Sequence, residues 1–325
     1  MFKHIPVIDI GDADTPAGLQ RVVRELDAAC RSAGFFYLAG HGVPPEFVAR
    51  QFDWSARFFA LPSAQKQALH LSHSPGHRGY EAVGDQRLDP AMNPDLKESF
   101  YCGAEYPDEH PFVRSGYTGY GHNQWPEQLL PGFRAQMLDY IGVMSVLGNR
   151  VMSLLAQALQ LPADYFAALH TDPMVTLRLL RYPPHPADAQ PADIGAGAHT
   201  DFGAITLLAQ DELGGLEVLN PGGEWIAAAP IAGTFVVNLG DMVPRWTNNR
   251  YRSNLHRVIN RNSSGRPRFS IPFFYGPRYD ARIRCVPTCM PASGAPAWPE
   301  CSAGEHHLEQ YRKSYGKTIA ARETA

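Results

Sequence analysis

The segment GAHTDFGAITLLAQD, residues 197–211, places a histidine and an aspartate two positions apart at the head of an apolar run. In a β-strand, residues i and i+2 point to the same face, so we expect His199 and Asp201 to project into one space. An imidazole and a carboxylate that share a space can bind the same metal ion. This pair is therefore the starting point for a possible metal site.

A second pair with the same spacing, His170 and Asp172, occurs earlier in the chain. It follows a helical segment and runs directly into Pro173, which favours a loop and removes a backbone donor. We therefore expect His170 and Asp172 to lie in a loop and not to bind a metal.

The third ligand of such a site has to come from a later strand, and His256 is the candidate. It lies in the β-patterned stretch NLHRVIN, residues 254–260. The histidines further on, His306 and His307, lie in a segment that is typical of an exposed C-terminal helix. Two histidines and one carboxylate with open coordination positions suit non-haem Fe(II). The same set could hold zinc in a non-catalytic sensor or binding barrel, and metal analysis distinguishes the two.

A group suited to binding an anion follows in the run RFSIPFFYG, residues 268–276. Arg268 and Ser270 share one strand face. A buried arginine is costly unless it meets an anion, and its fork suits a carboxylate, to which the serine adds a hydroxyl group. Tyr182, on the strand TLRLLRY, is a third candidate for this group. Arg178 shares the face of Tyr182 and could contact an acidic substrate or pair with a buried carboxylate.

The elements that must position these residues follow from apolar periodicity and turn signals. Segments 19–34, 45–62 and 133–155 show helical periodicity, and the third is expected to be one long amphipathic helix. From about residue 174 to 284, short strands alternate with turns, as in an antiparallel sandwich or barrel. The sequence NPGG at 220–223 is expected to be a hairpin turn.

Residues 72–126 lack periodicity over a length that is uncommon for a loop, and their aromatic residues argue against disorder. We expect this segment to be functional, as a lid or a dimer contact. Phe100 and Tyr101 in this segment, and Phe202 and Phe274 in the barrel, are weak candidates for a substrate pocket. Core packing is the alternative for all four.

The composition limits the classes of function. The chain has 325 residues, of which 44% are hydrophobic and 19% charged, and its formal net charge is −3. This charge gives no bulk attraction to nucleic acid or to an anionic membrane. No secretory signal and no run of about 20 apolar residues is evident. We expect the arginine-rich stretch 250–268 to be a solvated loop around one functional arginine.

The five cysteines are an odd number in a large chain, which favours free thiols over a disulfide scaffold. With the limits on charge and apolar runs, this indicates a cytoplasmic protein. The oligomeric state stays open between a monomer and a homodimer. The expected partner of the protein is a small molecule, with no nucleic acid and no membrane.

These motifs occur together and in order, and the chain resembles the isopenicillin N synthase-like family of Fe(II)- and 2-oxoglutarate-dependent oxygenases. In the second half the resemblance is carried by HTD at 199–201, HRV at 256–258 and RFS at 268–270. It is extended by PVIDI, GFFYLAGHGV, FFALP, PDLKESF, RLLRYPP, LGDM and RWTN, at residues 6–10, 34–43, 58–62, 94–100, 178–184, 239–242 and 245–248. The resemblance spans roughly residues 5–280.

The resemblance implies an α+β protein in which a double-stranded β-helix, or jelly roll, is flanked by helices and a mixed N-terminal region. The chain then divides into an N-terminal oxygenase region at 1–125 and a backing helix at 126–173. The jelly-roll catalytic core follows at 174–284, and a C-terminal tail and helix occupy 285–325.

The resemblance also implies the metal and cosubstrate site. The implied ligands of Fe(II) are His199, Asp201 and His256. The remaining coordination positions would take the 2-oxo acid end of 2-oxoglutarate and O2. The residues implied for the distal carboxylate of 2-oxoglutarate are Arg268, Ser270 and Tyr182.

The implied activity is the oxidation of a small molecule by hydroxylation, desaturation or cyclisation, with release of succinate and CO2. The alternative is an Fe(II) oxidase of the same fold that uses no 2-oxoglutarate, in which Arg268 and Ser270 bind the substrate carboxylate. Leu180 and Arg181 precede Tyr182, where plant members carry asparagine and an aromatic residue. Plant substrates are therefore not carried over to this chain.

Overall fold

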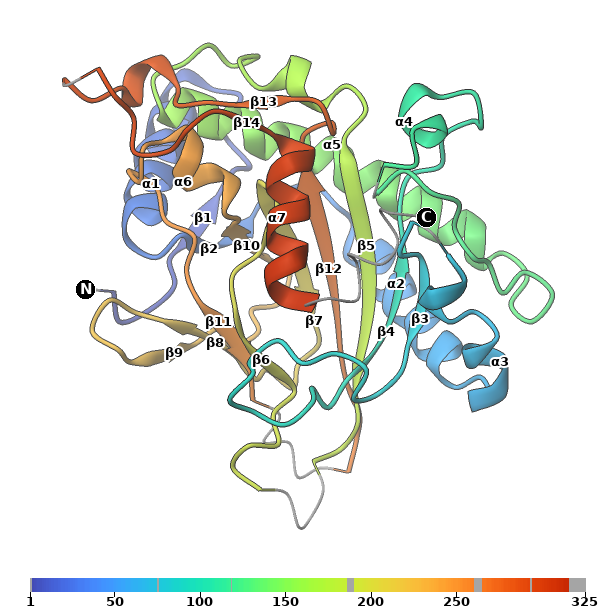
Figure 1. Ribbon diagram of the computed structural model, residues 1–325. Helices are drawn as coiled ribbons and strands as arrows, with labels where there is room; N and C mark the ends of the chain where they lie inside the picture. Colours follow the sequence, from blue (N-terminus) through green and yellow to red (C-terminus); the bar gives the residue numbers. More distant parts are fainter. Residues whose placement is uncertain are drawn as a thin grey trace.

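The computed structural model describes residues 2–74, 76–117, 119–185, 190–259, 265–292 and 294–315, which form two main sheets surrounded by helices (Figure 1). The larger sheet has the order β1 (Val7–Asp9), β2 (Phe35–Ala39), β10 (Phe235–Leu239), β7 (Ile205–Gln210), β12 (Arg268–Gly276), β5 (Met174–Tyr182), β4 (Glu98–Cys102) and β3 (Gly79–Glu81). The smaller sheet has the order β6 (Ala196–His199), β11 (His256–Val258), β8 (Leu216–Leu219) and β9 (Trp225–Ala227). A third sheet pairs β13 (Arg282–Ile283) with β14 (Cys301–Ser302).

From β5 to β12 the chain passes back and forth between the two main sheets, which produces the jelly roll. β5, β7, β10 and β12 belong to the larger sheet, whereas β6, β8, β9 and β11 belong to the smaller one. The N-terminal strands extend the larger sheet at both edges, with β1 and β2 on one side and β3 and β4 on the other. The expected α+β fold with a jelly-roll core is confirmed.

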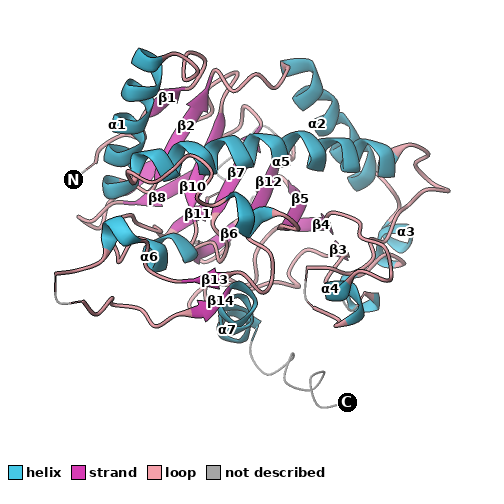
Figure 2. Ribbon diagram, turned by 90° about the horizontal axis from the view of Figure 1, so that it is seen from above, coloured by secondary structure: helices cyan, strands magenta, loops and turns pink. Residues whose placement is uncertain are grey.

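Three helices cover the outer face of the larger sheet, namely α1 (Pro16–Ser32), α2 (Pro45–Phe59) and α5 (Phe133–Ala158) (Figure 2). α1 begins where the hydroxyl of Thr15 accepts a hydrogen bond from the backbone N–H of Gly18 at 3.1 Å, with a proline at the first helical position. α5 is the long helix that the apolar periodicity predicts. Within the described ranges it alone is long and apolar enough to cross a membrane, but its buried face packs in the core, and core helices pass the same test.

The apolar side chains form two cores on the two faces of the larger sheet. One core lies between this sheet and the helices and includes the aromatic cluster of Phe58, Phe100 and Phe133. The other lies between the two main sheets and includes Phe35 and Tyr182. The space that the second core leaves open between the sheets holds the candidate site.

The shorter helices lie in the connections, except for α7 (Ala303–Tyr315), which follows the last strand. The others are α3 (Ser63–Gln67), α4 (Pro111–Arg114), α6 (Met242–Trp246) and the 3-10 turns η1 (Leu71–His73), η2 (Ala167–His170) and η3 (Pro287–Cys289). All five cysteines are free thiols.

The C-terminal helix α7 differs from the exposed helix that the sequence predicts. It lies beside β13 and β14 in Figure 2, and His306 is only 2% exposed. A Cβ atom on Gly304 would lie 2.3 Å from the ring of Tyr279, so the backbone of α7 is in close contact with the barrel. The expectation of an exposed helix is therefore wrong for the face of α7 that carries His306. The charged residues on the other face dominate the composition of the helix and led to that expectation.

Candidate active site

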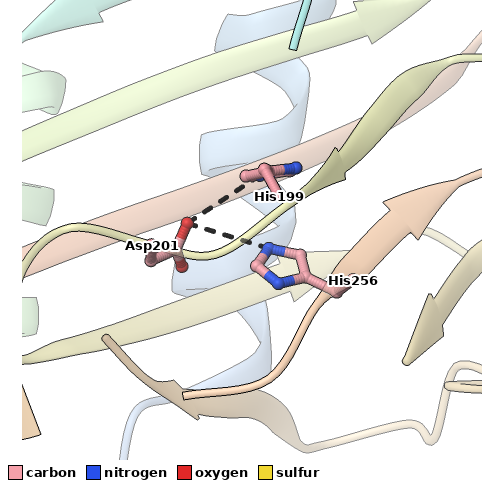
Figure 3. Close-up of side chains that lie close together, drawn as sticks. All are labelled: His199, Asp201 and His256. Carbon is pink, nitrogen blue, oxygen red and sulfur yellow. Dashed lines mark ion pairs between the residues drawn. The ribbon is translucent and has the colours of Figure 1, made fainter. Parts of the chain in front are cut away.

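His199, Asp201 and His256 meet between the two main sheets, and their candidate ligand atoms all lie within 4.8 Å of one another. The Nε2 atom of His199 lies 3.9 Å from Oδ1 of Asp201, and the Nε2 atom of His256 lies 3.7 Å from the same oxygen (Figure 3). β6 ends at His199, β11 begins at His256, and the register of the smaller sheet pairs these two residues. The three donors thus surround one point, as a facial metal triad requires.

Asp201 reaches this point by a different route from the one that the sequence predicts. It lies beyond the end of β6, in the connection that crosses to β7, so the alternation of a strand does not place it. The backbone N–H of Asp241 donates to the carbonyl oxygen of Asp201 at 2.8 Å. A Cβ atom on Gly240 would lie 2.3 Å from the carbonyl oxygen of Gly203, so the LGDM turn packs closely against this connection.

The two imidazoles are held with their Nε2 atoms toward the metal position. Nδ1 of His199 lies 2.7 Å from the carbonyl oxygen of Gly197, and Nδ1 of His256 lies 3.2 Å from that of Asn254. Because Nδ1–H donates to a carbonyl, Nε2 keeps its lone pair for a metal. Burial, together with the neighbouring His256, lowers the pKa of His199 to about 3, which favours the neutral ring that binds metals.

The carboxylate of Asp201 is divided between two tasks. Its Oδ2 atom accepts hydrogen bonds from Thr206 Oγ1 at 2.5 Å and from Asn238 Nδ2 at 2.6 Å. Its Oδ1 atom faces the two imidazoles. Burial opposes ionisation, but the two histidines and these two hydrogen bonds outweigh it and lower the pKa of Asp201. The donor set therefore fits a divalent metal such as Fe(II).

The predicted anion group lies in the same space. Arg268, Ser270 and Tyr182 are at most 2% exposed, and Nη1 of Arg268 donates to Oγ of Ser270 at 3.3 Å. The Arg268 guanidinium lies 4.7 Å from the centre of the Tyr182 ring and also donates through Nε to the carbonyl of Gly214. Tyr182 therefore contributes the face of its ring to this group.

A buried cation without an acidic partner calls for an anionic ligand. Across the described part of the chain, no carboxylate lies within ion-pair distance of Arg268, although its charge is fully buried. A cavity of about 560 Å³ connects Arg268 and Ser270 with His199, Asp201 and His256. This arrangement fits a ligand that binds the metal at one end and carries a carboxylate at the other.

A second and larger cavity, of about 990 Å³ measured to its open mouth, adjoins the triad on the other side. His199, Asp201, Arg178 and Phe274 line both cavities. Phe202 and Tyr101 line the larger one, as the sequence predicts for a substrate pocket. Phe274, Phe202 and Tyr101 thus stay candidates for substrate contacts.

Arg178 fulfils one of the two roles that the sequence left open, because it pairs with a buried carboxylate, whereas a contact with an acidic substrate stays a prediction. It lines the cavity, and it also forms an ion pair of 2.8 Å with Glu81. Its Nη2 further donates to Gln86 Oε1 at 2.9 Å and to Ser99 Oγ at 2.7 Å, and its guanidinium lies 4.4 Å from the ring centre of Tyr101. The charge of Arg178 is therefore largely matched by the protein itself.

Phe100 is placed differently from its neighbour Tyr101. Successive residues of β4 point to opposite faces, and Phe100 is fully buried against Phe58 and Phe133 under the helices. It lines neither cavity. The structure thus moves Phe100 from the candidate pocket to the core.

The structure also places in the site several residues that the sequence did not single out. They are Thr206 and Asn238 at the carboxylate of Asp201, Lys97 in the smaller cavity, and His77, Arg78 and His307 in the larger one. The polar Thr206 and Asn238 interrupt the apolar runs AITLLAQ and TFVVNLG, which was a usable signal. The others lie in segments without periodicity or in the C-terminal helix, where no pattern marks them.

The earlier pair, His170 and Asp172, lies apart from the metal position. His170 is buried, with its ring stacked on Tyr275 at 5.0 Å between ring centres. Nδ1 of His170 lies 2.9 Å from the carbonyl oxygen of Phe166. Among the described residues, the metal-binding group consists of His199, Asp201 and His256, without this pair.

A jelly roll whose facing sheets hold a His-Asp-His triad beside a buried arginine defines a class of non-haem Fe(II) oxygenases. Comparison with known families agrees with this class. Residues 5–128 match the N-terminal model "non-haem dioxygenase in morphine synthesis", and residues 171–277 match the 2OG-Fe(II) oxygenase superfamily.

Curated relatives match nearly the whole chain. A 2-oxoglutarate-Fe(II) type oxidoreductase, hxnY, of Emericella nidulans is 39% identical over 94% of this chain and 88% of its own length. The 2-oxoglutarate-dependent dioxygenase citB of Monascus ruber is 41% identical over 97% of both chains.

A solved structure shares the fold and carries a relevant ligand. A full-length Neurospora crassa protein in complex with alpha-KG and thymine has a TM-score of 0.85 and 31% identity, covering 96% of this chain and 97% of that one. The chain belongs to the 2OG-Fe(II) oxygenase superfamily. It is a 2-oxoglutarate-dependent dioxygenase that requires Fe(II), 2-oxoglutarate and O2.

Proposed function

We propose that 2-oxoglutarate occupies the smaller cavity with its distal carboxylate on Arg268 and Ser270, and that a small molecule is oxidised in the larger cavity. The observation that carries this proposal is the buried guanidinium of Arg268, which has no carboxylate within ion-pair distance among the described residues and lies in a cavity shared with the metal triad. Tyr182 supports the assignment, because its ring lies against the guanidinium and fixes the plane of the fork.

The residues of the chain perform binding, orientation and the exclusion of water. His199, Asp201 and His256 would hold Fe(II), which, together with 2-oxoglutarate and O2, supplies the oxidising chemistry with release of succinate and CO2. Arg268 and Ser270 anchor the cosubstrate. The apolar side chains of Leu180, Leu216 and Val258 line the same cavity and keep bulk water from it.

The test is the affinity of the Fe(II) protein for 2-oxoglutarate under anaerobic conditions. Replacing Arg268 by glutamine removes a charge-assisted hydrogen-bonding pair, so we expect 2-oxoglutarate to bind about tenfold to a hundredfold more weakly. Arg266→Gln is the matched control, because Arg266 lies nearby but pairs with the exposed Glu212. Iron affinity should be unchanged in both variants.

The outcome also separates the proposal from its alternative. If Arg268→Gln leaves the affinity for 2-oxoglutarate unchanged and the wild type forms no succinate, Arg268 and Ser270 bind the primary substrate of an oxidase. Succinate that appears without any added substrate would count against that alternative.

The names of the relatives refer to different substrates. The Neurospora crassa structure is described with thymine, a rice relative is named homoarginine-6-hydroxylase, and another rice structure is a dioxygenase for auxin oxidation. We therefore leave hydroxylation, desaturation and cyclisation open as outcomes for this chain. A cytoplasmic location, a monomer or homodimer, and the absence of nucleic-acid and membrane partners stay predictions.

A further inference from the structure

The smaller cavity holds a buried lysine to which the proposed function assigns no role. Lys97 lines this cavity together with the metal triad, and it is absent from the described lining of the larger cavity. It is 3% exposed, although lysine is almost never fully buried without a partner. Because Lys97 lines only the cavity that we assign to 2-oxoglutarate, we look for its role at the cosubstrate and not at the primary substrate.

The charge of Lys97 is matched, but its hydrogen-bonding capacity is not used up. Nζ of Lys97 donates to Oδ2 of Asp95, which is 1% exposed, so the two groups form a buried ion pair. An ammonium group has three N–H donors. Across the residues that the structure describes, the bond to Asp95 is the one hydrogen bond that Nζ donates. The remaining donors can therefore serve an acceptor in the cavity.

Asp95 ties this ion pair to the strand that carries a metal ligand. Oδ1 of Asp95 accepts a hydrogen bond of 3.1 Å from the backbone N–H of Gly197, whose carbonyl oxygen lies 2.7 Å from Nδ1 of His199. The backbone N–H of Leu96 also donates to the carbonyl oxygen of Ile194 at 3.0 Å. The segment that carries Lys97 is thus held along β6, which positions the ammonium group before any ligand binds.

The charges around Lys97 place its ammonium group away from Arg268. Burial lowers the pKa of Lys97 to about 8, and Arg178 is the charge that adds most to this effect. Along β5, Arg178 lies four residues from Tyr182, which pairs with Arg268, so these two levels of the sheet are about 13 Å apart. With a pKa of about 8, Lys97 remains mostly protonated at pH 7.

The ammonium group also acts on a metal ligand. Burial and the charge of His256 lower the pKa of His199 to about 3, and the charge of Lys97 is a further cause in the same direction. Since the interaction between two charges weakens with distance, this effect agrees with an ammonium group close to the metal position. Lys97 and Arg268 therefore lie toward opposite ends of the smaller cavity.

The cosubstrate has a carboxylate at each end. In the proposed function, Arg268 and Ser270 bind the distal carboxylate, whereas the 2-oxo acid end lies at the metal position. A carboxylate has two oxygens, so an oxygen that faces the protein still needs a donor in a buried site. A hydrogen bond from an ammonium group to a carboxylate is of the strong, charge-assisted kind.

We propose that Lys97 binds the carboxylate at the 2-oxo acid end of the cosubstrate, so that a separate cation holds 2-oxoglutarate at each end of the cavity. Asp95 is the positioning residue that orients Lys97 and balances its charge. This inference rests on the proposed function, because it completes the same cosubstrate site.

The experiment uses the full chain loaded with Fe(II) under anaerobic conditions and two probes. 2-Oxoglutarate has both carboxylates, whereas 2-oxobutyrate has the 2-oxo acid end and lacks the distal carboxylate. The visible charge-transfer band of an iron-bound 2-oxo acid gives the affinity for each probe, and competition with a chelator gives the affinity for Fe(II).

Lys97→Met removes the ammonium group and keeps a long side chain. We expect both probes to bind about tenfold more weakly to this variant. Arg268→Gln should weaken the binding of 2-oxoglutarate alone, because 2-oxobutyrate has no carboxylate for Arg268. Lys3→Met, the same substitution at an exposed position, is the control that should bind both probes like the wild type.

Two further variants test for a folding defect, because Lys97→Met leaves the carboxylate of Asp95 without its partner. Asp95→Asn keeps the ammonium group of Lys97 and an oxygen for the N–H of Gly197, so both probes should bind at least as tightly as to the wild type. The double variant Asp95→Asn/Lys97→Met leaves no unpaired charge. It should bind both probes about tenfold more weakly than Asp95→Asn does.

The affinity for Fe(II) distinguishes direct binding from an effect on the metal ligand. Removing a cation near a metal ion does not weaken metal binding, whereas a displacement of His199 through Gly197 would weaken it. We therefore expect the double variant to bind Fe(II) at least as tightly as the wild type.

The outcomes separate this inference from the proposed function. Equal affinities of Asp95→Asn and the double variant for 2-oxobutyrate would overturn the role of Lys97, and so would a loss of iron affinity as large as the loss of probe affinity. A wild type that forms the band with 2-oxoglutarate but not with 2-oxobutyrate would also overturn it, because the 2-oxo acid end would then gain too little from the protein. Absence of the band with both probes would instead count against the proposed 2-oxoglutarate site.

Discussion

At the scale of single residues, the site depends on how one carboxylate is shared. Asp201 presents Oδ1 to the metal position and keeps Oδ2 for Thr206 and Asn238. These two hydrogen bonds fix the rotation of the carboxylate, so the metal does not have to order it on binding. Ligand orientation of this kind typically accounts for a substantial part of the affinity of a metal site.

Asn238→Leu tests this division of the carboxylate. It keeps a similar volume but removes the amide donor, so we expect about a tenfold to hundredfold loss of Fe(II) affinity. Anaerobic competition with a chelator measures this affinity. Thr234→Val, whose hydroxyl bonds to Ile231 in an exposed turn, should leave it unchanged. An Asn238→Leu protein with wild-type iron affinity would show that Oδ2 needs no partner.

The ligands themselves could be predicted from the sequence, and Thr206 and Asn238 left a signal there, whereas Lys97 and Arg78 could not be predicted. His199, Asp201 and His256 combine rare residue types in apolar contexts, and this combination is visible without a structure. Lys97 and Arg78 become part of the site only because the strands that carry or follow them form the far edge of the larger sheet. Their proximity to the triad depends on long-range pairing that no local pattern contains.

At the scale of elements, α5 determines how the outer face of the larger sheet is packed. Gly142 on its exposed face has nothing within 4 Å of a Cβ atom, whereas a Cβ atom on the buried Gly148 would lie 2.9 Å from the ring of Tyr275. The ring of Tyr275 is held in place by a hydrogen bond of 2.7 Å from its hydroxyl to Asn149. The same substitution in one helix should therefore have opposite effects at these two positions.

We expect Gly142→Ala to raise the free energy of unfolding by about 0.5–1 kcal/mol, because alanine has the higher helix propensity. Gly148→Ala should lower it by about 1–3 kcal/mol through overpacking against Tyr275. Urea unfolding followed by circular dichroism measures both. Equal effects of the two substitutions would contradict the packing of α5 on β12.

Periodicity predicted the long helices α1, α2 and α5 and the strand-rich region from about residue 174 to 284, but not the short helices or β3 and β4. The positions of Asp201 and α7 also needed the structure. β6 ends at His199, so Asp201 is positioned by the turn at Gly240 and not by a strand. α7 contributes His307 to the lining of the larger cavity, although its composition is typical of a solvent-exposed helix. In both cases the position of the residue or helix depends on a contact with a distant part of the chain, which a local sequence pattern does not contain.

At the scale of the whole molecule, buried histidines outside the metal site link stability to pH. Burial lowers the pKa of His170 from 6.5 to about 4 in the folded protein. Between these values the unfolded chain binds the proton and the folded protein does not. Stability from this residue is therefore complete above pH 6.5 and is lost as the pH falls toward 4.

His170→Phe should reduce this dependence on pH, because phenylalanine can keep the stacking on Tyr275 without titrating. We expect wild-type stability to fall by about 2 kcal/mol more than that of the variant between pH 7 and pH 5. Denaturant unfolding of both proteins at the two pH values gives this difference. Parallel losses in both proteins would show that His170 does not resist protonation in the fold.

The whole molecule also explains why segment 72–126 has no simple pattern. It supplies β3 and β4 at the edge of the larger sheet, together with Arg78 and Tyr101 in the wall of the larger cavity. Its residues contact β5 and the cavity at different points, so their types do not follow the regular spacing that a single buried face would produce. The sequence could therefore not predict which residues of this segment line the larger cavity.

The most direct test of the central claim is a spectroscopic titration without oxygen. Fe(II) is added to metal-free protein, then 2-oxoglutarate, and the weak visible charge-transfer band of an iron-bound 2-oxo acid is recorded. We expect the band in the wild type and in Arg266→Gln, and no band in His199→Ala. In Arg268→Gln, the concentration of 2-oxoglutarate that gives half of the full band should be at least about tenfold higher than in the wild type. A wild-type protein that binds iron but forms no band would contradict the assignment of the smaller cavity to 2-oxoglutarate.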